Sequence, residues 1–89
     1  MRVIWSIPAL RDVAGHRAYI AQYNPMAAID ITRRLAAAGD NLTTFPQRGR
    51  PGSKPGTREL TVIYPYIIVY KIEDEQLTIL RVWHGAQER

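Results

Sequence analysis

Two long apolar runs in the second half of the chain decide its fold. They read Tyr66-Ile67-Ile68-Val69-Tyr70-Lys71-Ile72 and Leu77-Thr78-Ile79-Leu80-Arg81-Val82-Trp83. Runs rich in β-branched and aromatic residues are typical of strands, and the first is apolar enough to be buried on both faces of a sheet. The acidic segment at residues 73–75 separates the runs and predicts a turn. We therefore expect an antiparallel pair of strands at the centre of a sheet.

The residues before this pair extend the sheet and lead into it. Residues 58–64 alternate, which predicts a strand with Leu60, Val62 and Tyr64 on one face and a corner at Pro65. Residues 45–57 hold three prolines and three glycines, a density that predicts a connector without regular structure. Residues 2–5 form a short apolar run and predict a first strand.

Two helices are predicted between the first strand and the connector. Ser6 is a favourable N-cap with Pro8 in the first turn, and the apolar spacing predicts a helix over residues 7–23. Asn24 followed by Pro25 is a second start signal, for a helix that runs to about Thr43. The second helix has one apolar stripe, formed by Ala28, Ile31, Leu35, Ala38 and Leu42. The predicted fold class is α+β, in the order β-α-α-β-β-β, with a helical hairpin packed on a mainly antiparallel sheet.

Length and composition exclude several classes of protein. We expect residues 1–89 to form a single domain. The chain has no cysteine and only two widely separated histidines, so we expect no disulfide, metal site or cofactor. No apolar run reaches the ~18 residues of a membrane span, and the N-terminal run is too short for a signal peptide. We expect a cytoplasmic protein.

The charge distribution points to a polyanionic or acidic partner. Twelve Lys and Arg residues face eight Asp and Glu, giving a formal net charge of +4. Between Asp40 and Glu59 the sequence has no acidic residue, but it carries four cations: Arg48, Arg50, Lys54 and Arg58. Such a patch attracts nucleic acid or an acidic protein segment, and arginine pairs well with both phosphate and carboxylate. The alternative interpretation is that these cations belong to a solvated loop without a binding role.

Five side chains are candidates for a functional site: Arg50, Lys54, Arg58, Arg81 and His84. A histidine titrates near neutrality and can act as a general acid or base, while cations stabilise charge on a phosphate. The structural alternatives are a packed histidine at the end of a strand, and ion pairs across strands for Arg58 and Arg81. His16 is interpreted as a helix-surface residue with no partner, and most aromatic residues as core.

The ordered set of motifs resembles the RelE/ParE superfamily, the toxins of type II toxin–antitoxin systems. The resemblance rests on Trp5-Ser6-x-x-Ala9, Asn24-Pro25-x-Ala27-Ala28, Phe45-Pro46-x-x-Gly49-Arg50, Gly56-Thr57-Arg58-Glu59-Leu60, Val69-Tyr70-Lys71-Ile72 and Ile79-Leu80-Arg81-Val82-x-His84-Gly85-Ala86. It spans nearly the whole chain, although no single motif is specific. It implies a bacterial toxin that acts on translation or replication.

Within the superfamily, the resemblance leaves two activities open. RelE-like members cleave mRNA in the ribosomal A site, with cations and an aromatic acid–base group. Here two positions where that pattern places arginine hold Ile67 and Gln87, and the ending Leu80-Arg81-Val82-Trp83-His84-Gly85-Ala86 looks more ParE-like. The favoured expectation is therefore a non-enzymatic inhibitor of DNA gyrase, with Arg50, Lys54, Arg58, Arg81 and His84 binding the target or the antitoxin. The alternative is a ribosome-dependent endonuclease with His84, Arg81 and Arg58 as its catalytic set. A third possibility is a member that binds antitoxin but is not toxic.

The resemblance also implies a partner. Such toxins are silenced in a hetero-oligomer by a small antitoxin, ParD-like or similar, whose C-terminal segment wraps the toxin as an amphipathic helix and an extended stretch. Because the antitoxin normally supplies operator recognition, we expect no sequence-specific DNA binding by this chain alone.

Overall fold

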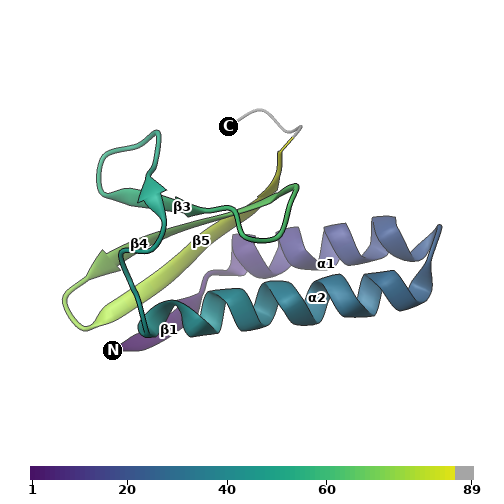
Figure 1. Ribbon diagram of the computed structural model, residues 1–89, viewed down its shortest axis with the longest axis horizontal. Coiled ribbons are helices and arrows are strands. Elements are labelled where there is room, and N and C mark those ends of the chain that lie inside the picture. Colours follow the sequence, from purple (N-terminus) through teal and green to yellow (C-terminus); the bar gives the residue numbers. More distant parts are fainter. Residues whose placement is uncertain (86–89) are drawn as a thin grey trace.

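A helical hairpin packs against one face of a five-stranded sheet in the computed structural model, which describes residues 1–85 (Figure 1). The elements in chain order are β1 (Arg2–Trp5), α1 (Ile7–Ala21), α2 (Pro25–Asp40), the 3-10 helix η1 (Asn41–Thr43), β2 (Arg50–Pro51), β3 (Thr57–Leu60), β4 (Tyr66–Glu73) and β5 (Gln76–His84). The predicted order and the α+β class are confirmed, with β2 as an additional short strand.

The helices begin where the capping residues predict. The side chain of Ser6 accepts a hydrogen bond from the Ala9 N–H at 3.1 Å, and that of Asn24 accepts one from the Ala27 N–H at 3.0 Å. Their ends differ from the expectation by up to a turn. The first helix ends at Ala21 rather than Tyr23, and the second tightens into η1 after Asp40. Terminal turns are often 3-10, which sequence periodicity does not resolve.

The sheet is mainly antiparallel with one parallel edge. Its strand order is β1-β5-β4-β3-β2; β1 runs parallel to β5, and the remaining neighbours are antiparallel. The predicted central strand, β4, lies in the middle; half of its side chains are buried and only Glu73 is exposed. The core between sheet and hairpin contains Ala9, Leu35, Leu42, Leu60, Ile68, Tyr70, Leu77, Ile79 and Val82. The apolar stripe predicted on α2 faces this core.

Two predictions about the segments before β4 were wrong. The predicted strand over residues 58–64 ends at Leu60, and Tyr64 is 92% exposed while Ile63 is buried. The chain must reverse between β3 and β4, and the Tyr66 N–H donates to the Ile63 carbonyl at 2.8 Å in that reversal. A turn breaks the alternation on which the prediction rested. The connector also holds a regular element, because Arg50 and Pro51 pair with β3 as the edge strand β2.

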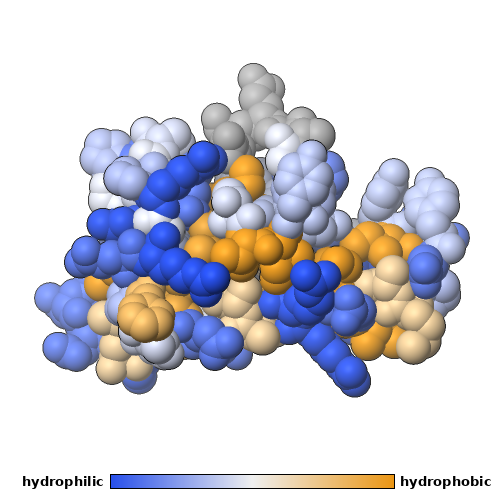
Figure 2. All heavy atoms as spheres, viewed as in Figure 1, coloured by the Kyte–Doolittle hydropathy of each residue, from blue (hydrophilic) through white to orange (hydrophobic). Residues whose placement is uncertain are grey.

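The helical hairpin extends well beyond the sheet in Figure 1. Large apolar side chains on and near its distal end are exposed, and Tyr23 and Met26 exceed 70% exposure. Hydrophobic residues form a band across this face of the molecule in Figure 2. This part of the hairpin therefore has apolar surface that the sheet does not cover.

Candidate functional site

A bulge in β5 decides which way the candidate residues point. Val69 pairs with Arg81 and Tyr70 pairs with Ile79, so Leu80 is an extra residue in the ladder. Such an insertion reverses the alternation after it. Uninterrupted alternation along β5 would put Ile79, Arg81 and Trp83 on one face. Instead Ile79 lies in the core facing the helices, whereas Arg81 and Trp83 lie on the opposite face.

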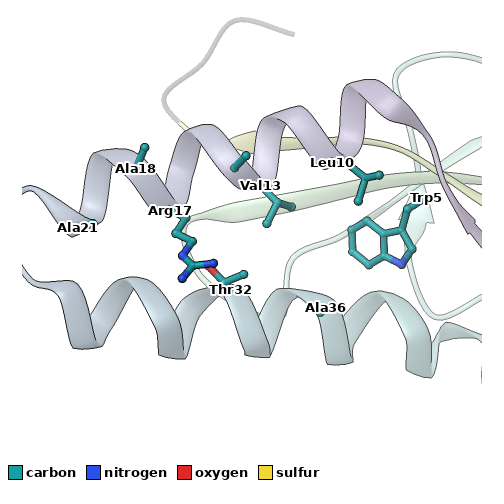
Figure 3. A pocket seen from close by; sticks show the side chains of 9 residues that line it. Trp5, Leu10, Val13, Arg17, Ala18, Ala21, Thr32 and Ala36 are labelled. Carbon is teal, nitrogen blue, oxygen red and sulfur yellow. The ribbon is translucent and has the colours of Figure 1, made fainter.

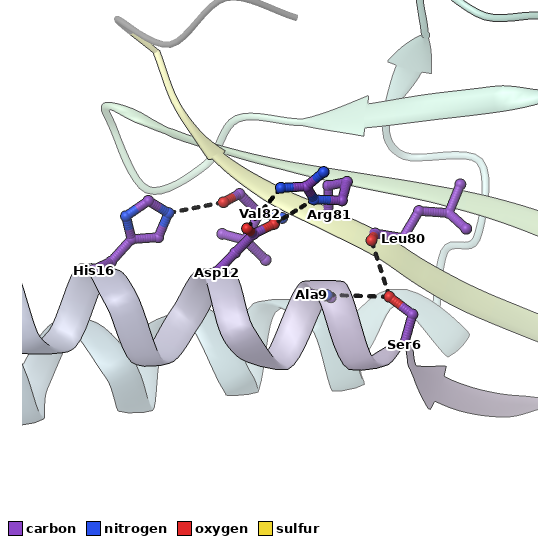
Figure 4. A network of polar contacts seen from close by, with 7 residues as sticks. All are labelled: Ser6, Ala9, Asp12, His16, Leu80, Arg81 and Val82. Atoms are coloured by element: carbon purple, nitrogen blue, oxygen red, sulfur yellow. Dashed lines mark hydrogen bonds and ion pairs between the residues drawn. The ribbon is translucent and has the colours of Figure 1, made fainter.

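Helix α1 and its N-cap supply hydrogen bonds to the edge of β5 where β1 stops pairing with it (Figure 4). The Ser6 hydroxyl donates to the Leu80 carbonyl at 2.9 Å, the Val82 N–H donates to Asp12 at 2.9 Å, and His16 Nε2 donates to the Val82 carbonyl at 2.7 Å. An exposed strand edge otherwise offers unpaired backbone groups to other chains. The interpretation of His16 as a surface residue without a partner was wrong, because β5 passes directly beside it.

Arg81 is held by a helix rather than by a neighbouring strand. Its Nε and one terminal nitrogen donate to the two carboxylate oxygens of Asp12 at 2.8 and 2.9 Å, and its guanidinium carbon lies 3.9 Å from the centre of a Trp83 ring. The Asp12 hydrogen bond raises the pKa of Arg81. Burial alone would raise the pKa of Asp12, but the Arg81 and Val82 hydrogen bonds and the Arg81 charge together lower it below its ordinary value.

We call the sheet face turned away from the helices the outer sheet face, meaning the surface formed by Lys54, Glu59, Arg81 and Trp83. These side chains line a cavity of about 360 Å³, together with Ser53, Thr57, Val69 and Leu80. Arg50 also lies here and pairs with Glu59 at 3.2 Å. Within the described part of the chain, the Lys54 ammonium has no ion pair. It is therefore the candidate cation whose charge is least offset.

Arg58 lies on the opposite side of the sheet and supports the connector. It pairs in register with Tyr70, a core residue, and cross-strand partners share a face. Arg58 donates to the carbonyls of Gly49 at 2.7 Å and Gln47 at 3.3 Å. The Tyr70 hydroxyl accepts from the Gly49 N–H at 2.9 Å and donates to the Pro46 carbonyl at 2.6 Å. Arg58 thus stabilises a loop instead of presenting a free charge.

His84 also faces the helices, where it belongs to a cluster of aromatic rings. The Tyr66 ring lies 5.5 Å from that of His84 and 5.0 Å from that of His16, measured between centroids. Burial raises the pKa of Tyr66. These three rings line a cavity of about 320 Å³ with Tyr19 and Ile20. Sequence reasoning missed the roles of His16 and Tyr66, because their proximity to His84 arises only when α1 packs beside β4 and β5.

A second feature that sequence reasoning did not anticipate is an apolar groove between the two helices (Figure 3). Its volume is about 590 Å³. It is lined by Trp5, by Leu10, Val13, Ala14, Arg17, Ala18 and Ala21 of α1, and by Thr32 and Ala36 of α2. Small side chains on both helices leave room between them, and the amphipathic spacing on α1 is the only signal that could have indicated it.

Other kinds of site find no support in residues 1–85. No cluster of three or more potential metal ligands occurs among these residues. None of the helices described here has the length and hydropathy needed to cross a membrane. Gln87, where the RelE-like pattern places a cation, lies outside the described residues.

Comparison with known proteins identifies relatives over the full length. Residues 3–89 match the family model described as the ParE toxin of the type II toxin–antitoxin system parDE. The chain is 40% identical to "Toxin RelE2" of Caulobacter vibrioides over 97% of each chain. It is also 40% identical to "Putative toxin Y4kP" of Sinorhizobium fredii, over 98% of this chain and 91% of that protein.

A solved structure has the same fold. A chain from the chromosomal ParDE toxin–antitoxin system of P. aeruginosa superimposes with a TM-score of 0.87 at 22% sequence identity, covering 94% of this chain and 95% of that one. Together with the family match over nearly all residues, this confirms the resemblance drawn from the motifs. The chain belongs to the ParE family of type II toxin–antitoxin toxins, within the RelE/ParE superfamily.

Proposed function

We propose that this toxin inhibits DNA gyrase by binding, without catalysis of its own. The observation that carries the proposal is the separation of the residues that a nuclease would need together. Arg81 lies on the outer sheet face, while Arg58 and His84 lie on the side of the helices. The three therefore do not surround one position.

Cleavage of an RNA backbone requires convergence of its catalytic groups. A base must reach the 2′-hydroxyl within about 3 Å, and cations must lie near the phosphate as charge develops on it. Asp12 already neutralises Arg81, and two backbone carbonyls occupy Arg58. None of the predicted cations lines the described cavity that contains His84. This arrangement favours a protein-binding toxin over a ribonuclease.

The outer sheet face is the surface we assign to the target. Lys54 supplies a charge without an ion pair among the described residues, and Trp83 supplies an aromatic surface beside it. Trp is enriched among the residues that dominate binding energy at protein interfaces, and the Lys54 charge attracts acidic groups of a partner. Arg50 and Arg81 contribute less net charge because Glu59 and Asp12 pair with them.

We assign the antitoxin to the groove between α1 and α2. An apolar groove between helices accepts the apolar face of an amphipathic segment. The hairpin also exposes apolar residues near its distal end, which adds apolar surface for a partner to cover. The complex is a hetero-oligomer in the bacterial cytoplasm, with operator recognition left to the antitoxin.

A ribosome-dependent endonuclease is the second candidate. The observation in its favour is the cluster of His16, Tyr66 and His84, three titratable rings around one cavity. The relative from Caulobacter vibrioides also carries the name RelE2. For this candidate His84 is the acid–base group, and it requires cations from outside the cluster.

Two parallel assays on toxin separated from antitoxin test the proposal. We expect loss of supercoiling by purified gyrase, and intact mRNA in a reconstituted translation reaction. The Lys54→Ala variant should weaken gyrase inhibition, whereas Arg33→Ala, which removes an exposed cation from α2, should not. Codon-phased mRNA cleavage that disappears in His84→Ala, with normal supercoiling, would establish the endonuclease instead. Normal growth, supercoiling and mRNA with a stable antitoxin complex would indicate a member that is not toxic.

A further inference from the structure

Among the described residues that line the groove between α1 and α2, Arg17 is the one that carries a charge. Its guanidinium points into the space between the helices, toward Thr32 (Figure 3). The Thr32 hydroxyl donates to the Ala28 carbonyl at 2.7 Å, and among residues 1–85 no hydrogen bond joins Thr32 to Arg17. Residues 1–85 offer Arg17 no ion pair, and its side chain is exposed. The groove therefore contains a free cation surrounded by apolar walls.

Nearby acidic residues on the helices form ion pairs with other arginines. Asp12, on the same helix, faces β5 and pairs with Arg81, and Asp30 on α2 lies 3.9 Å from Arg34. The groove has no acidic residue in its lining within residues 1–85. A partner that fills the groove must therefore supply the group that pairs with the Arg17 guanidinium.

We propose that Arg17 selects the antitoxin by pairing with a carboxylate on the segment that fills the groove; this rests on the proposed function. An apolar helix laid over Arg17 would strip water from the guanidinium without replacing its hydrogen bonds, which is costly. A Glu or Asp can satisfy the planar guanidinium through two parallel hydrogen bonds. A Lys or Arg at that position would be repelled, which adds discrimination between partners.

The walls of the groove define the rest of the occupant. Ala14, Ala18, Ala21 and Ala36 are small, so a partner backbone can approach closely. Helix α1 has 15 residues, which corresponds to a length of about 22 Å and about four turns of a parallel partner helix. The predicted occupant is an amphipathic helix of that length with apolar residues along one face and one acidic residue near its middle.

A displayed library tests this inference without any antitoxin in hand. The library presents amphipathic helices with the 15-residue length of α1 and random residues at the positions flanking the apolar face. Selection on purified wild-type toxin should enrich Asp or Glu at one central position. Selection on Arg17→Glu should enrich Lys or Arg there, and selection on Arg11→Glu, an exposed cation of α1 outside the groove, should match wild type.

A double-mutant cycle on a selected peptide measures how strongly its central carboxylate pairs with Arg17. Replacing its central Glu with Gln should weaken binding to wild-type toxin by at least about tenfold, and binding to Arg17→Gln by less than about twofold. Failure to select groove binders, or identical enrichment on wild-type and Arg17→Glu toxin, would overturn the inference. The selection contains no gyrase, so a wild-type toxin that leaves supercoiling intact would refute the proposed target separately.

Discussion

Removing the Asp12 carboxylate is the sharpest test of how α1 holds β5. In the native protein this carboxylate, 13% exposed, accepts two hydrogen bonds from Arg81 and one from the Val82 N–H. Asp12→Ala leaves the Val82 N–H without its partner, which costs about 1–2 kcal/mol. Because Arg81 is 39% exposed, solvent screens the ion pair and its loss adds about 1 kcal/mol or less. We expect a total destabilisation of about 1–3 kcal/mol.

The measurement is reversible denaturation by heat or urea, followed by far-UV circular dichroism. For a domain of this size the expected loss lowers Tm by about 4–24 °C. Asp30→Ala is the matched control, because it removes the carboxylate of an exposed helix pair whose atoms are 3.9 Å apart. That control should change the free energy of unfolding by less than about 0.5 kcal/mol.

An Asp12→Ala variant as stable as Asp30→Ala would refute the assignment of a structural role to this contact. The result also decides how variants of Arg81 should be read. If Arg81→Ala abolishes gyrase inhibition while an equally folded Asp12→Ala retains it, then Arg81 contacts the target directly. If both variants lose gyrase inhibition only at temperatures at which they unfold, Arg81 contributes to stability and does not contact the target.

Three further predictions concern the pH dependence of the Asp12 contact, the charge of Lys54 and the packing of two glycines. Because the pKa of Asp12 is lowered, the stabilisation by its carboxylate is complete above the ordinary value of 3.8 and is lost as pH falls through the folded pKa. The free energy of unfolding should therefore fall more steeply in wild type than in Asp12→Asn between about pH 5 and pH 3, as acid titration of unfolding will show. Lys54→Glu should reduce gyrase inhibition while changing the unfolding free energy by less than about 0.5 kcal/mol, since the side chain makes no ion pair within the described residues. Gly15→Ala should stabilise the protein by about 1 kcal/mol in urea denaturation, because the new Cβ meets open space. Gly39→Ala should destabilise it by about 1–2 kcal/mol, because its Cβ would overlap the ring of Trp5. Equal effects of the two substitutions would contradict the packing.

Much of the fold followed from local chemistry. Both helix starts were predictable because Ser6 and Asn24 satisfy backbone N–H groups within three residues of themselves. The β4 and β5 strands were predictable because their apolar runs are long and a turn separates them. The family was recognisable because its motifs recur in a fixed order along the chain. Each of these signals lies within a few neighbouring residues or in their linear order.

The site depended on information that no local pattern contains. Which face Arg81 and His84 occupy was decided by the extra residue at Leu80, because an insertion in a strand ladder is visible only against the partner strand. Likewise Asp12 meets Arg81, and His16 meets Val82, across 69 and 66 residues of sequence. Charge patterning identified the cations, but tertiary packing alone decided which of them are neutralised, because an ion pair depends on distance in space. For the same reason Lys54 and Arg17, the cations left unpaired among residues 1–85 at the outer sheet face and in the groove, are the residues on which recognition is now expected to depend.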